Sequence, residues 1–342
     1  MQIKEQTDMK EENGIVREAD IECTFTLKIK ESCFKPGRVR VHLPAPVNAE
    51  WLYMGQVLTS APAFRMISIE DHPQRSTWFD EVLEENRPFS VTYAFESAPE
   101  AIVPDIGEIN RTSQPGRAIG PALIRQYEEK NHCDCSSYTG PLADKVTVMD
   151  LASETAIKVP SREEAARILG LSREEVAKFF GDRAENTGDL INLVFRFCAN
   201  HTAGSVAEVS DGAPESRNIL LVMLMRALGV PARWQGGFRI KEGTAAPADW
   251  AIVNAAPYGW IYMDAEAAHE AFEAGNRELA EFYFGGIDAL RIPTASKIGA
   301  GLYPARDYKR SDEKYNLFGE VEFEERGLGA DEFSTSVTVK VQ

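Results

Sequence analysis

The sequence lacks any apolar run long enough to cross a membrane and has no apolar segment near its N-terminus. A spanning helix needs about 20 mostly apolar residues, and a secretory signal needs a short apolar region behind a basic start. The chain instead begins with MQIKEQTDMKEENG, which is charged throughout. We therefore expect no membrane segment, and we take a cytoplasmic location as the default.

Basic charge is also scarce. The 342 residues include 53 acidic and 37 basic ones, which gives a net charge of −16. Nucleic acids and anionic membranes attract proteins that present a basic face. The sequence therefore argues against both as partners, and the simplest interpretation of the excess is a soluble acidic surface.

Cysteines are few and odd in number: Cys23, Cys33, Cys133, Cys135 and Cys198. A chain of this size without a secretory signal fits reduced thiols better than a disulfide framework. The Cys-Asp-Cys segment at 133–135 lacks the two-residue spacing and the second ligand pair of a zinc site. We expect no bound metal and no cofactor.

The first hundred residues have the pattern of short strands. Apolar and polar side chains alternate over 21–29, 39–43 and 89–95, which is the period of a half-buried strand. Two further strand-like pieces lie at 64–69 and 76–79. Short strands separated by turn residues are typical of an antiparallel β-sandwich.

Helical patterns dominate later. Two Ser-x-x-Glu pairs, at 161–164 and 172–175, have the spacing of capping boxes. The segment 187–200 is a strongly apolar helix that contains Cys198, which we interpret as a core thiol. The predicted parts are a flexible N-terminus (1–16), a β-sandwich domain (17–98), a wrapping interdomain segment (99–142), a helix-rich domain (143–300) and a strand-containing tail (301–342).

The stretch 212–264 is the most informative. Asn218 to Leu228 is almost wholly apolar and predicts a buried helix, which Gly229 and Pro231 end. Strands are predicted at 232–238, 250–255 and 260–263, with a Pro-Tyr-Gly turn between the last two. A helix packed on antiparallel strands makes the predicted fold class α+β.

Three short motifs in this stretch carry a family resemblance. They are GVPARWQ at 229–235, DW at 249–250 and APYGW at 256–260, the last followed by Asp264. Together they resemble the core of the transglutaminase-like superfamily, a branch of the papain-like cysteine enzymes, and in particular a bacterial two-domain subgroup. The resemblance implies a papain-like, transglutaminase-like domain over 143–300, preceded by the antiparallel β-sandwich.

The family's reaction uses a Cys at the start of the helix, a His base on the next strand and an Asp that orients the His. Carried over by position, Pro214 stands for the Cys, Ala248 stands for the His, and Asp264 is retained. No Cys follows Cys198, and no His lies between 201 and 269. The resemblance therefore implies a family scaffold without its nucleophile or base.

Other side chains are expected around the former cleft. Asp264 either remains as a hydrogen-bonding residue or acts as a general acid or base whose pKa burial has raised. Ser216 has no His at the base position, so we do not expect a serine nucleophile. The helix start would also offer free N–H groups to an anion. The candidate ligand-binding residues are Trp234, Gln235, Asp249, Trp250, Glu215 and Tyr262, with the tryptophans either packed inside or presenting ring surface to a ligand.

Three functions remain open at this point. The preferred one is a non-catalytic homologue that binds a peptide, an amine, a small metabolite or a protein partner in the former cleft. The alternative is a repurposed lyase, isomerase or hydrolase that acts on a small metabolite, with Asp264 as general acid or base. A third is a cysteine enzyme that brings Cys133 or Cys135 into the cleft.

Overall fold

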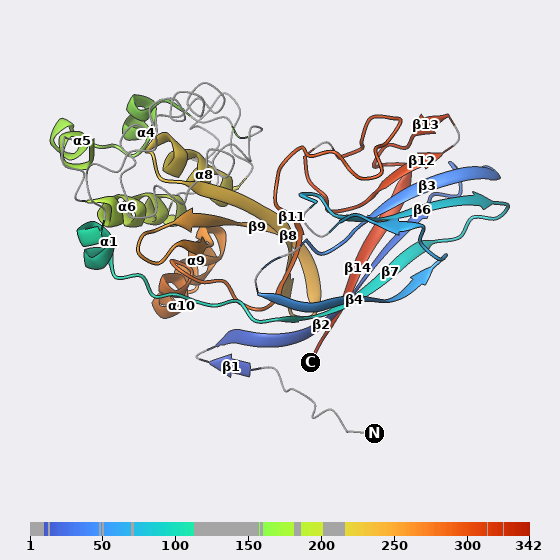
Figure 1. Ribbon diagram of the computed structural model, residues 1–342, viewed down its shortest axis with the longest axis horizontal. Helices are drawn as coiled ribbons and strands as arrows, with labels where there is room; N and C mark the ends of the chain where they lie inside the picture. The colour runs from blue at the N-terminus through green and yellow to red at the C-terminus, as the bar shows by residue number, and fades with distance from the viewer. Residues whose placement is uncertain are drawn as a thin grey trace. The chain divides into compact units, whose positions relative to one another are not determined.

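The computed structural model describes residues 10–12, 14–47, 49, 51–69, 72–112, 157, 160–180, 186–200, 216–312, 314–323 and 325–342 (Figure 1). The chain forms two compact units, which we describe separately. The first is made of Met1–Pro99, Gly236–Ala248 and Asp288–Gln342, and the second of Glu100–Gln235 and Asp249–Ile287. The units are therefore interleaved in sequence, whereas the predicted domains follow one another along the chain.

The larger sheet has the strand order β11-β8-β9-β14-β2-β7-β4, β1 pairs with β2, and the first unit supplies most of the sheet. Its strands are β1 (Lys10–Glu12), β2 (Ile15–Ile29), β4 (Leu52–Ala61), β7 (Phe89–Ser97), β8 (Ala232–Lys241), β9 (Thr244–Asn254), β11 (Arg291–Ala295) and β14 (Phe333–Val341). In the long central pairs, β2 runs antiparallel to both β7 and β14. The predicted period of two is present in β2, where Ile21, Cys23 and Phe25 are buried and alternate with more exposed residues.

The second sheet of this unit has the order β13-β12-β3-β6-β5. Its strands are β3 (Gly37–Pro44), β5 (Met66–Ile67), β6 (Ser76–Leu83), β12 (Glu320–Phe323) and β13 (Arg326–Gly327). Side chains from both sheets share one apolar core, in which the rings of Phe79 on β6 and Phe89 on β7 meet edge to face at 5.5 Å. The predicted antiparallel β-sandwich is confirmed by this arrangement.

Some strands begin or lie where the sequence pattern does not place them. The predicted flexible arm over 1–16 contains β1, and β2 begins within it at Ile15, which is buried together with Val16. Strands β4 and β11 were not predicted. Strand β11 is buried at every position, so its residues do not alternate between apolar and polar types.

Buried ion pairs secure the last part of the first unit. Glu320 of β12 accepts a hydrogen bond from Arg306 Nη1 at 2.5 Å and lies 3.5 Å from Arg310 Nε. The same carboxylate accepts the backbone N–H groups of Ser311 and Asp312. The chain before β12 is thus held to the sheet by charge-assisted hydrogen bonds, which are stronger than neutral ones.

The second unit is mainly helical. Its described helices are α1 (Ile106–Thr112), α4 (Arg162–Ile168), α5 (Arg173–Phe180), α6 (Thr187–Asn200), α8 (Arg217–Ala227), α9 (Ala265–Glu273) and α10 (Arg277–Phe282). Both predicted helix starts are present: Ser161 accepts the N–H of Glu164, and Ser172 accepts the N–H of Glu175. Only the second pair is a full capping box, because Glu175 also accepts the N–H of Ser172.

Helix α8 is the buried centre of the second unit, with every residue from Arg217 to Ala227 buried. It ends before Gly229, whose φ of 80° favours glycine. The last residues of β9 pair antiparallel with β10 (Trp260–Met263), with Asn254 opposite Trp260. A buried helix beside antiparallel strands confirms the predicted α+β class, and none of the described helices is long and apolar enough to cross a membrane.

Several predicted features lie outside the described residues. These are most of the wrapping segment, the pair Cys133 and Cys135, and the helix-start residues Pro214 and Glu215. Among the described cysteines, Cys23, Cys33 and Cys198 are free thiols. Burial raises the pKa of the Cys198 thiol well above its ordinary value, which fits the predicted core thiol.

Candidate functional site

Ser216 begins the candidate site, which lies in the second unit at the start of α8. It is the N-cap of this helix, and its Oγ accepts the N–H of Ile219 at 3.0 Å. The same hydroxyl donates a hydrogen bond to Asp249 Oδ2 at 2.6 Å. The side chain therefore caps the start of the helix and also joins it to β9.

Several side chains of this region donate hydrogen bonds to the carboxylate of Asp249. Its carboxylate receives hydrogen bonds from the hydroxyl of Ser216, from Trp234 Nε1 at 2.8 Å and from Asn218 Nδ2 at 3.3 Å. The residue keeps partial exposure. Burial of the carboxylate raises its pKa to about 6, against the opposing effect of these hydrogen bonds, and the nearby Asp264 adds to the rise.

Asn218 links the two aspartates of the site. Its side-chain amide donates to Asp264 Oδ1 at 3.0 Å and to the backbone carbonyl of Asp249 at 2.9 Å. Its carbonyl oxygen accepts the N–H of Ala265 at 2.7 Å. Both ends of this fully buried amide are therefore used, and the start of α8 is joined to the start of α9.

Asp264 is the N-cap of α9. Its Oδ1 accepts the N–H of Ala267 at 2.9 Å in addition to the amide of Asn218. The residue is 2% exposed. These contacts are those of a structural carboxylate, since a helix cap and a buried amide share the same oxygen atom.

The tryptophans pack inside the protein. Trp234 is 2% exposed and Trp250 is fully buried. The indole N–H of Trp250 donates to Gln235 Oε1 at 2.7 Å, and Gln235 is itself buried. Of the two alternatives for the tryptophans, the structure shows internal packing: the indole N–H of Trp234 donates to Asp249, and Gln235 holds Trp250. A ligand-binding role of these three side chains stays a prediction.

The other candidate residues lie around this cluster. Ala248 immediately precedes Asp249 on β9 and is partly exposed, as is Tyr262 on β10. Arg217 is buried and forms an ion pair with Glu266 at 3.1 Å, and the guanidinium of Arg233 lies 4.1 Å from the ring of Trp260. The positions of Pro214 and Glu215 lie outside the described residues.

Among the described residues of this unit, His269 is the histidine, and it lies on α9. Its Nδ1 is hydrogen-bonded to the backbone carbonyl of Ala199 at 2.8 Å. The described residues also contain no group of His, Cys, Asp and Glu side chains arranged to hold a metal ion. The site is therefore built from two carboxylates and neutral hydrogen-bond donors.

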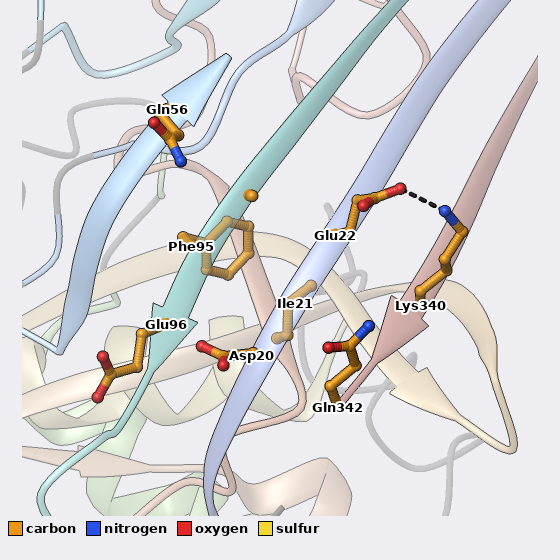
Figure 2. A pocket seen from close by; sticks show the side chains of 9 residues that line it. Asp20, Ile21, Glu22, Gln56, Phe95, Glu96, Lys340 and Gln342 are labelled. Carbon is orange, nitrogen blue, oxygen red and sulfur yellow. Dashed lines mark hydrogen bonds and ion pairs between the residues drawn. The ribbon is translucent and has the colours of Figure 1, made fainter. Parts of the chain in front are cut away.

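A separate hollow of about 210 Å³ lies on the larger sheet of the first unit (Figure 2). Its polar side chains come from β2, β4, β7 and the end of the chain, and they are Asp20, Glu22, Gln56, Glu96, Lys340 and Gln342. Lys340 is engaged with Glu22 at 2.6 Å. The hollow is an open, acidic strip of sheet surface, and an acidic strip alone does not define a ligand.

Comparison with known proteins agrees with the motifs. Residues 177–265 match the family model of the transglutaminase-like superfamily. The chain therefore contains a transglutaminase-like core, and this segment includes α6, α8, both aspartates of the site and the tryptophans.

A solved structure of a presumed cysteine protease from Cytophaga hutchinsonii is similar to this chain with a TM-score of 0.46 and 13% identity, over 95% of this chain and 90% of that one. The comparison with curated proteins found no match.

Two parts of the site were not found from the sequence. The sequence pattern marks Asn218 only as the first residue of an apolar helix, although it is the residue that joins Asp249 and Asp264. No motif links Ser216 to Asp249. A polar residue at the start of an otherwise apolar helix was the available signal for Asn218, since a buried amide needs partners.

Proposed function

We propose that the protein is a transglutaminase-like homologue that has lost thiol-based acyl transfer and works by binding. Its ligand would be a peptide, an amine, a small metabolite or a protein partner, bound near the start of α8 without turnover. The observation that carries this proposal is the use of Asp264. A carboxylate that caps α9 and holds Asn218 acts as a structural element of the fold.

The sequence supports the same proposal at the other two positions. Pro214 has no nucleophilic atom, and Ala248 has no proton to accept or donate. The reaction of the family needs both groups, because the thiolate is formed and held by the imidazole. Fold alone does not carry function, so the proposal rests on the residues that stand at these positions.

A metabolite assay tests whether turnover occurs. Wild-type protein and the Asp249→Asn and Asp264→Asn variants are incubated with a cell metabolite extract, and untargeted mass spectrometry follows what is consumed and what is retained. We expect no compound to be consumed by any of the three proteins, and a compound or partner to be retained by the wild type. Consumption by the wild type and by neither variant would overturn the proposal.

A second function is favoured by one observation, the pKa of about 6 at Asp249. A general acid or base works best when its pKa lies near the working pH. The repurposed enzyme would then use Asp249, with Asp264 as support through Asn218. Loss of turnover in Asp249→Asn, together with a wild-type rate that changes near pH 6, would establish this alternative over simple binding.

A further inference from the structure

Three donors from two elements meet at one carboxylate. The hydroxyl of Ser216 and the amide of Asn218 come from the start of α8, and the indole N–H of Trp234 comes from β8. All three are uncharged, and all point at the side chain of Asp249 on β9. Such a set of converging donors is the arrangement by which proteins bind a carboxylate from outside.

We propose that these three donors form a carboxylate-binding site that Asp249 occupies in the free protein and that a ligand's carboxylate takes over on binding. The proposal rests on the proposed function, and it names the chemical group that the binding region recognises. The start of α8 adds to the site, because the positive end of a helix favours a negative group. Ser216 is partly exposed, which places the edge of the site near solvent, whereas the carboxylate of Asp249 is itself buried.

The charged groups around Asp249 determine at which pH a ligand's carboxylate can most easily displace it from the three donors. Asp264 faces it through Asn218, Arg217 on α8 is paired with Glu266, and Arg233 on β8 lies against Trp260. An ionised Asp249 competes with an entering anion for the same donors, whereas a protonated one does not repel it. Since burial raises the pKa of Asp249 to about 6, exchange should become easier as the pH falls from 7.5 to 5.5.

The indole N–H resonances of the tryptophans provide the measurement. Trp234 donates to Asp249, while Trp250 donates to the amide oxygen of Gln235 and serves as the internal control. In a ¹⁵N–¹H spectrum of the wild type, we expect the Trp234 resonance to move with a midpoint near pH 6 and the Trp250 resonance to stay in place. A wild-type Trp234 resonance that does not titrate would overturn the proposal, even if every variant failed to fold.

Removing the internal carboxylate tests the exchange itself. In Asp249→Ala, sodium acetate at pH 7 should move the Trp234 resonance back toward its wild-type position. The variant should bind acetate about tenfold or more tightly than the wild type does, because three donors regain a charged acceptor. Acetamide is the uncharged control and should have no effect. Asp249→Asn is the matched variant, since its own side chain fills the space and should prevent acetate binding.

A further ligand distinguishes a carboxylate at the C-terminus of a peptide from the carboxylate of a small acid. N-acetylglycine, which imitates the C-terminus of a peptide, would bind Asp249→Ala more tightly than acetate if the natural ligand is a peptide end, and more weakly if it is a small acid. Failure of acetate to move Trp234 in folded Asp249→Ala, or an equal response to acetamide, would contradict the inference. Neither result depends on whether the metabolite assay detects turnover, so the two proposals can fail separately.

Discussion

Buried carboxylates are held in different ways in the two units. In the first unit, Glu320 is held by the guanidinium groups of Arg306 and Arg310, with backbone N–H groups completing its contacts. In the second unit, Asp249 and Asp264 receive hydrogen bonds from a hydroxyl, an amide, an indole and a backbone N–H. The first arrangement neutralises the buried charge, and the second only solvates it.

The difference has a direct electrostatic consequence. A cation within hydrogen-bond distance stabilises the ionised carboxylate, whereas neutral donors offset only part of the cost of burial. The pKa of Asp249 accordingly rises to about 6. A group in this condition can change its charge near pH 6.

The largest expected effect follows from breaking the charged arrangement. Glu320→Ala would leave Arg306 and Arg310 without their shared acceptor in a buried position. Removing one partner of a buried ion pair typically costs about 3–5 kcal/mol, so urea unfolding should show a loss of that size. The control is Lys340→Ala, which breaks the exposed pair with Glu22 and should cost about 1 kcal/mol or less. Equal losses in the two variants would contradict the comparison.

The next largest loss of stability is expected from removing the uncharged donors around Asp249 and Asp264. Asn218→Ala would remove two donors from the aspartates and the acceptor of the Ala265 N–H. Leaving buried polar groups without partners costs about 1–3 kcal/mol each, so we expect about 2–4 kcal/mol less stability by urea unfolding. Asn192→Ala on α6 is the matched control, because among the described residues its amide oxygen accepts a hydrogen bond from the exposed side chain of Arg196. A loss no larger than that of the control would show that Asn218 is dispensable.

A smaller effect depends on pH. Because the folded pKa of Asp249 lies above its ordinary value of 3.8, the folded state binds the extra proton between about pH 4 and 6. The contribution of this group to stability is therefore full below the ordinary pKa and is lost as the pH rises through 6.

Unfolding of the wild type and Asp249→Asn from pH 4 to 8 measures this effect. The stability of the wild type relative to the variant should fall by about 1–3 kcal/mol over that range. A flat or rising difference would contradict the raised pKa.

The smallest expected difference in stability is between removing an ordinary helix N-cap and removing the N-cap that also belongs to the site. Ser161→Ala removes only the N-cap of α4 and should cost about 0.5–1 kcal/mol. Ser216→Ala removes the N-cap of α8 and also a donor to Asp249, so it should cost about 1 kcal/mol more. Thermal unfolding of both variants at pH 7.5 compares them, and identical shifts would mean that the contact with Asp249 adds nothing.

Local features were predictable where the sequence carries a local physical signal. The alternation around Phe25 predicts a half-buried strand, and the Ser-x-x-Glu spacing at Ser172 predicts a helix start; both are present. The motifs around Trp234 and Trp250 predict the transglutaminase-like core, which the family model matches. Strand β11 was missed because a strand buried on both faces lacks alternation, and α1 was missed because it is only seven residues long.

The sequence by itself determined that positions 214 and 248 carry neither a thiol nor an imidazole, because they are Pro214 and Ala248. It also determined the helices and strands that carry the site, through apolar patterning and caps. Only the tertiary structure decided how the polar side chains of the candidate site are joined. The meeting of Ser216, Asn218 and Trp234 at Asp249 joins residues up to 33 positions apart, and no local preference specifies such hydrogen bonds before helix and strand pack together.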